Sequence, residues 1–106
     1  MIVVTSENVV GHRIVESIGQ VFGVVVRSRG LGGNLMAGLR SIAGGEIKEY
    51  TSLVEDTRRH AIDRLVQNAK LMGADAVVMM RFDSGEICQA MNEVVAYGTA
   101  VRLEPE

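Results

Sequence analysis

The clearest pattern in the chain is an apolar stripe at helical spacing between about Ser52 and Met72. Ser52 and Glu55 match the capping-box pattern, in which each side chain satisfies one free backbone donor at the start of a helix, so we expect the helix to begin at Ser52. Lys70 suits the helix dipole in the last turn, and Gly73 can adopt the left-handed conformation that ends a helix. The pattern predicts a long helix whose apolar face consists of Val54, Ala61, Ile62, Leu65, Val66, Ala69 and Met72.

Apolar segments on both sides of this helix predict three long strands and one short strand. These are Arg13–Ser28, Ala76–Asp83, Asn92–Leu103 and the short Ile2–Thr5. We expect a bend in the first long strand at Gly19 or Gly23, and a loop around Ser84-Gly85 between the last two.

A second, shorter helix is predicted over Leu35–Ala43, with Asn34 as its N-cap and Gly44-Gly45 as its end. The element order is strand, short helix, long helix, strand, strand. We therefore predict one domain over 1–106 with an α+β, two-layer fold. It is a β-α-β-β subunit with an antiparallel sheet and one long helix, preceded by the short helix.

The predicted strands are apolar on both faces, although a half-exposed antiparallel strand normally alternates. In the last strand, one face carries Val95, Tyr97, Thr99, Val101 and Leu103, and the other carries Val94, Ala96, Gly98 and Ala100. One long helix covers only one face of such a sheet, and the short helix could cover part of the other. An uncovered apolar face indicates an interface, so we expect a homo-oligomer.

Composition narrows the possible partners and the compartment. The net charge of −2 gives no basic footprint for nucleic acid or an anionic membrane, and no apolar run has the length of a membrane span. Met1 leads directly into a strand-like segment rather than a signal peptide, and the single cysteine, Cys88, fits a reducing environment. We expect a cytoplasmic protein that binds neither nucleic acid nor membranes.

A heavy-metal site needs thiolate, imidazole or thioether ligands, and the chain offers Cys88, His12, His60 and six methionines in no clustered motif. Met79 and Met80 are adjacent in a strand, so their side chains point to opposite faces and are better explained as core and interface residues. Asp56 and His60 are one helical turn apart and could hold an ion, but a solvated charge pair explains them more simply.

Other candidate sites are weaker still. Cys88 lies in a predicted loop without a neighbouring base or cation to activate it. The loop Gly30–Asn34 could hold a small anion on its backbone amides, although it matches neither the dinucleotide nor the P-loop pattern. The carboxylate pairs Glu46 and Glu49, and Glu55 and Asp56, are interpreted as solvated surface.

The order and spacing of several short segments resemble the YbjQ-like family, whose uncharacterised members are labelled heavy-metal-binding. The resemblance is carried by Ile2-Val3-Val4-Thr5, Gly11, Gly23-Val24-Val25, Leu39–Gly45, Tyr50, Gly73-Ala74-Asp75-Ala76-Val77 and Gly98-Thr99-Ala100-Val101. It implies a β-α-β-β subunit, similar to the dodecin subunit, in a five-fold ring. Val24 and Glu46 depart from the family, in which a glutamate and an arginine are common at these positions.

Three functional hypotheses follow. The first is a homopentameric protein that binds a metal ion or a small anion without being an enzyme, and we favour it. The second is an enzyme whose site is assembled between subunits from Cys88, His60 or Asp75, and the third is a purely structural oligomer. No catalytic, cofactor or metal residue is assigned from the sequence.

Overall fold

The computed structural model describes residues 1–28, 48–88 and 91–106. Its elements are β1 (Ile2–Val3), β2 (His12–Ser28), α2 (Lys48–Leu71), β3 (Ala76–Cys88) and β4 (Met91–Pro105). The predicted short helix over 35–43 lies outside the described residues. Among those that are described, no helix has the length and hydropathy needed to cross a membrane.

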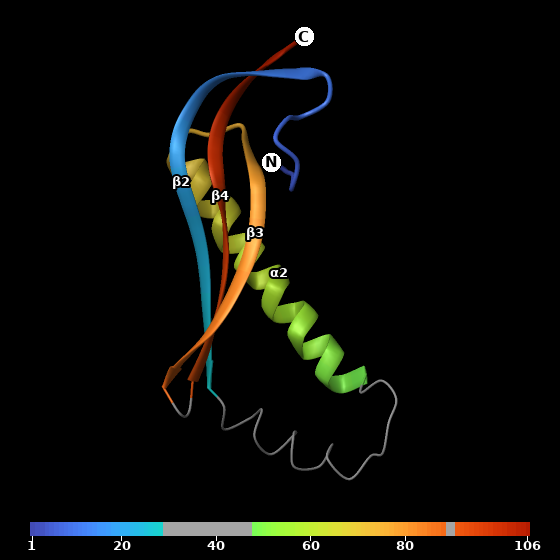
Figure 1. The fold of residues 1–106 in the computed structure, drawn as a ribbon, viewed down its shortest axis with the longest axis vertical. Coiled ribbons are helices and arrows are strands. Elements are labelled where there is room, and N and C mark those ends of the chain that lie inside the picture. The colour runs from blue at the N-terminus through green and yellow to red at the C-terminus, as the bar shows by residue number, and fades with distance from the viewer. Residues whose placement is uncertain (29–47, 89–90) are drawn as a thin grey trace.

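The four strands form one sheet in the order β1-β3-β4-β2, with α2 crossing one side of it (Figure 1). β4 pairs antiparallel with both β2 and β3, as predicted for the long strands. The short N-terminal strand adds a parallel pairing, Ile2 with Ala76 and Val3 with Val77, so the sheet is mixed. The predicted two-layer α+β architecture is confirmed.

Two predicted boundaries are wrong. α2 begins at Lys48, so Ser52 lies inside the helix and is not its cap. No glycine or proline interrupts 48–51, which explains why the helix can extend by a further turn. Ser84 and Gly85 do not form a loop, because they lie within β3 and pair with Val94 and Glu93. β3 and β4 form a hairpin, and residues 83–87 of β3, towards its end at Cys88, are exposed. An exposed strand can contain polar residues and glycine.

The main core lies between α2 and the sheet. Ala61, Leu65 and Ala69 are fully buried on the helix and pack against a cluster that includes Val21 and Val25 of β2. This confirms most of the predicted apolar face, but Val54 and Met72 at its two ends are 39% and 37% exposed.

Two glycines in β2 have different roles. Gly19 has a φ of 148° and lies directly after a register shift against β4. β2 is therefore irregular at Gly19, one of the two positions where a bend was predicted. Gly23 instead allows a close approach of the helix. A Cβ on Gly23 would overlap the backbone of Ala61 and Leu65.

The N-terminal segment covers part of the sheet face away from α2, at the end of the sheet where β1 lies (the upper end in Figure 1). There Val9 closes a second, smaller cluster with Ala76, Val78 and Val101. The backbone of Val4 continues the pairing of β1 by donating to the carbonyl of Val77 at 2.9 Å.

β3 contains an irregularity that the sequence did not predict. Its register against β4 shifts between Val78 and Arg81. Met79 there has a φ of 55°, and its amide donates to the carbonyl of Ser6 at 3.0 Å. Met80 points into the main core and is 8% exposed, whereas Met79 is 39% exposed. The interpretation of Met80 as a core residue is confirmed.

Candidate functional site

On the face away from α2, the end of the sheet where β3 ends and β4 begins (the lower end in Figure 1) carries an apolar surface. Val21 and Val25 face the helix, so the alternate residues of β2 face the other way. Their partners on β4 share this face, with Phe22 opposite Tyr97 and Val24 opposite Val95. We call this surface the outer patch; it consists of Phe22, Val24, Val26, Met91, Val95 and Tyr97.

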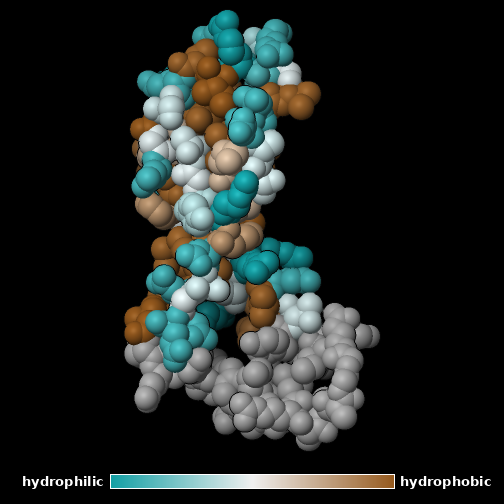
Figure 2. All heavy atoms as spheres, viewed as in Figure 1, coloured by the Kyte–Doolittle hydropathy of each residue, from teal (hydrophilic) through white to brown (hydrophobic). Residues whose placement is uncertain are grey.

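The outer patch is substantially exposed. Phe22 and Val26 are each 49% exposed, and Tyr97 is 39% exposed. Two carboxylates lie among these residues, since Asp83 pairs with Val95 and Glu93 with Val26. The space-filling view shows apolar side chains reaching the surface over the strands, in groups separated by polar ones (Figure 2). The sheet is thus apolar on both faces, as the strand pattern predicted.

A row of polar side chains on α2 bonds to β2, the strand at one edge of the sheet. Arg64 Nη1 donates to the backbone oxygen of Val24 at 2.6 Å, and Asn68 Nδ2 donates to that of Phe22 at 2.7 Å. These contacts occupy outward-facing acceptors that an edge strand otherwise leaves open. The sequence carries a signal for this row, because residues 60, 64 and 68 follow one another at one-turn spacing along one helix flank.

His60 belongs to the same row. It is exposed, as expected, but its Nδ1 lies 3.0 Å from Nη2 of Arg27. A guanidinium can only donate, so this imidazole nitrogen is the acceptor. Within the described parts of the chain, the partner of the His60 ring is on β2 and is not Asp56. Arg27 Nε is buried without a hydrogen-bond partner in the described part of the molecule.

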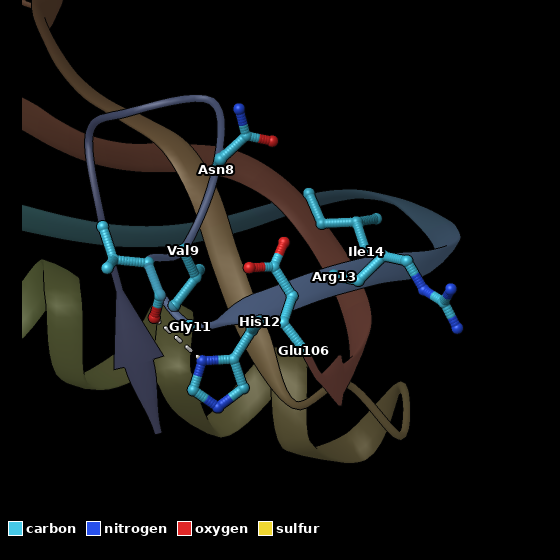
Figure 3. A pocket seen from close by; sticks show the side chains of 8 residues that line it. Asn8, Val9, Gly11, His12, Arg13, Ile14 and Glu106 are labelled. Carbon is cyan, nitrogen blue, oxygen red and sulfur yellow. Dashed lines mark hydrogen bonds between the residues drawn. The ribbon is translucent and has the colours of Figure 1, made fainter.

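His12 lies in a shallow hollow of about 480 Å³ formed by residues 8–14 and Glu106 (Figure 3). Its Nδ1 is 3.2 Å from the carbonyl oxygen of Val10, so this nitrogen carries the proton and donates. Nε2 is then the nitrogen with a free lone pair. Arg13 points away from the hollow and forms an ion pair with Glu104 at 2.8 Å.

Asp75 has a structural role. Its Oδ2 accepts from the amide of Leu103 at 2.8 Å, and its own amide donates to the carbonyl of Val101 at 2.9 Å. The residue therefore fixes the start of β3 against β4. Sequence analysis placed Asp75 in the segment 73–77 that carries the family resemblance and, in one hypothesis, in a catalytic site, but did not predict these contacts.

The other candidates are not brought together. Cys88 is the last residue of β3 and pairs with Met91, so it does not lie in a loop around Ser84. Glu55 forms an i,i+4 contact with Arg59 at 3.9 Å on the exposed side of α2, as expected for solvated surface. The loop 30–34, Glu46 and the side chain of Glu49 lie outside the described residues.

Over residues 1–28, 48–88 and 91–106, no group of three or more histidine, cysteine, aspartate or glutamate side chains could hold a metal ion. Within the described parts of the chain, the imidazoles of His12 and His60 are therefore isolated candidate ligands. A complete site would need groups from elsewhere.

Comparison with known proteins identifies the family. A family model described as "putative heavy-metal-binding", YbjQ, matches residues 1–104. The chain belongs to the YbjQ-like family. A UPF0145 protein of Bradyrhizobium sp. (strain ORS 278) is 69% identical over 105 residues, which cover 99% of this chain and 95% of the relative. A UPF0145 protein of Picrophilus torridus is 63% identical over 105 residues, with 99% and 89% coverage.

The YbjQ-like fold also has a solved counterpart. The crystal structure of a DUF74-family protein of unknown function from Pediococcus pentosaceus matches this chain with a TM-score of 0.62. The match covers 98% of each chain at 18% identity. At this identity the comparison supports the fold and says nothing of a ligand.

Proposed function

We propose that this YbjQ-like protein is a cytoplasmic homo-oligomer, a ring of five subunits, that binds a metal ion or a small anion at sites the subunits share. The observation that carries the proposal is the outer patch. A sheet whose second face is apolar is stable in water when another surface covers that face.

The burial pattern supports a second copy of the chain as the cover. The N-terminal segment shields only the upper end of this face, where Val9 completes the second cluster. Lower down, Val24 and Tyr97 are left 38% and 39% exposed. Interfaces of obligate oligomers resemble a divided core and bury roughly 2,000 Å² or more in total.

A shared metal site is supported by His12 together with the family description. The ring nitrogen that bonds to the carbonyl of Val10 fixes the tautomer, which is the common arrangement for a metal-binding histidine. One imidazole in each chain is too few for a closed site, so several subunits must contribute. A small anion is the alternative ligand, and its candidate site is the glycine-rich segment 30–34, which the sequence predicts to be a loop and which lies outside the described residues.

The direct test of assembly is sedimentation velocity with native mass spectrometry at micromolar concentration. We expect one species with five chains. A stable monomer of the wild-type protein would overturn the proposal.

Ligand binding is tested on the same preparation by element analysis and by titration with Zn²⁺. His12→Ala should abolish stoichiometric Zn²⁺ binding, whereas His60→Ala, whose ring is engaged with Arg27, should leave it intact. Equal Zn²⁺ binding by the wild type and His12→Ala would reject the histidine site. If neither protein binds Zn²⁺, titration with phosphate tests the anion alternative.

A further inference from the structure

The two flanks of α2 differ in chemistry. The flank towards β2 is polar, because Arg64 and Asn68 reach the carbonyls of that strand. The opposite flank carries Val54, Ile62 and Val66 at four- or eight-residue spacing. The guanidinium of Arg58, in the same row, lies 5.1 Å from the centre of the Phe82 ring on β3. This contact shows that the apolar row faces β3.

This second flank is incompletely covered. α2 packs mainly against β2 and β4 and makes few contacts with β3. Ile62, Val66 and Phe82 are accordingly only half-buried, and Val54 is 39% exposed. We call these four residues the flank patch. The molecule thus has two separate apolar surfaces, one on each side of the sheet.

The two surfaces carry opposite charge. Asp83 and Glu93 lie among the outer-patch residues, and neither has an ion-pair partner in the described parts of the chain. Arg81, opposite Tyr97, is a cation on the same face, and its guanidinium donates to the carbonyls of Thr5 and Met80. With two carboxylates against this one guanidinium, the outer patch is acidic on balance. The row of the flank patch includes Arg58 and ends at Lys70. Apolar surfaces with complementary charges favour each other over like surfaces, because placing two acidic patches face to face is unfavourable.

We infer that the outer patch of one subunit packs on the flank patch of the next, so that contact runs head to tail around the assembly. This inference rests on the proposed function, since it presupposes a homo-oligomer. Two different surfaces meeting in this way make a heterologous interface, which gives a ring when the rotation between neighbouring subunits closes and an open filament when it does not. A contact between two outer patches would instead give a two-fold dimer.

The experiment uses one blocking variant in each patch. Val26→Glu places a carboxylate in the outer patch, and Val54→Glu places one in the flank patch. Gln67→Glu, on the exposed side of α2, is the matched control. Far-UV circular dichroism checks that each variant is folded, and sedimentation velocity measures its mass.

We expect each blocking variant alone to be monomeric, with subunit affinity weakened by roughly a hundredfold or more, because an unpaired carboxylate is buried. Gln67→Glu should assemble like the wild type. An equimolar mixture of the two blocked chains should form a species of two chains and stop there. Each blocked chain still offers one intact patch, and these two patches are complementary.

Full assembly by Val54→Glu, or a mixture that stays monomeric, would overturn the head-to-tail arrangement while leaving the oligomer itself intact. A wild-type monomer would instead reject the proposed function. If a valine variant does not fold, the charges provide the second test. Arg58→Glu should weaken assembly, and Asp83→Lys in the same chain should restore it. No recovery in the double variant would contradict the pairing of the two patches.

Discussion

Leu65 lies with its backbone directly on Gly23, so closely that no side chain fits between α2 and β2 at this point. A Cβ added at residue 23 would come within 2.9 Å of the Leu65 Cα and closer still to its amide nitrogen and to the carbonyl of Ala61. Backbone atoms cannot rotate away as a side chain can. The distance between the helix and the sheet is therefore set by the absence of a side chain in β2.

Gly23→Ala should destabilise the fold by about 3 kcal/mol, at the upper end of the range for overpacked cores. Urea unfolding followed by circular dichroism measures the change. Gly85→Ala is the matched control, because a Cβ there meets nothing within 4 Å and the residue also lies in a strand. Equal unfolding midpoints for the two variants would show that the helix does not approach β2 at Gly23.

Leu65→Ala should lower the free energy of unfolding by roughly 2–5 kcal/mol, because this side chain is fully buried and its removal leaves a cavity. His60→Ala should cost about 1 kcal/mol or less, since it removes one exposed hydrogen bond to Arg27. Thermal unfolding of both variants at the same protein concentration makes the comparison. A smaller effect of Leu65→Ala than of His60→Ala would mean that the helix presents a different side to the sheet.

Met79 occupies a left-handed backbone conformation, with a φ of 55°. Branched side chains are strongly disfavoured there and glycine is not. Met79→Val should therefore destabilise by roughly 1–2 kcal/mol, whereas Met79→Gly should cost nothing or stabilise slightly. Chemical denaturation distinguishes them. A regular strand at this position would reverse the order, because valine favours strands and glycine does not.

Removal of metal should leave the fold intact. A structural ion stabilises a fold through a closed set of about four ligands, and the described residues provide no group of three. We expect the thermal midpoint in excess EDTA to match that in buffer within about 1 °C. A large fall would show that subunits converge on a structural ion, and Cys88→Ser would then be the first variant to examine.

The sequence predicted the elements whose pattern is local. The stripe of α2 and the two apolar faces of the strands were readable because their periodicities are set by each element's own geometry. The sheet order was not predicted, because it depends on pairing between distant segments. The bulge at Met79 was missed for the same reason, since it is fixed by a hydrogen bond to Ser6 from the N-terminal segment.

The candidate sites were harder to predict than the fold. Asp75 and Arg64 bond to backbone groups of Leu103 and Val24, which lie 28 and 40 residues away along the chain. No short motif encodes such contacts. Residue type identified both side chains as polar, but only the fold shows that they form hydrogen bonds to the backbone of a strand.

The position of β4 in the sheet has a consequence for synthesis. β2 and β3 do not pair with each other; β3 pairs with β1 and β4, whereas among the described strands β2 pairs with β4 alone. A nascent chain that has not yet released residues 91–105 from the ribosome has α2 but no partner strand for β2. The backbone groups of β2 that pair with β4 then have no strand partner until translation reaches residues 91–105. Pairing of β2 therefore follows synthesis of β4, and because these strands are far apart in sequence, their contacts favour slow folding.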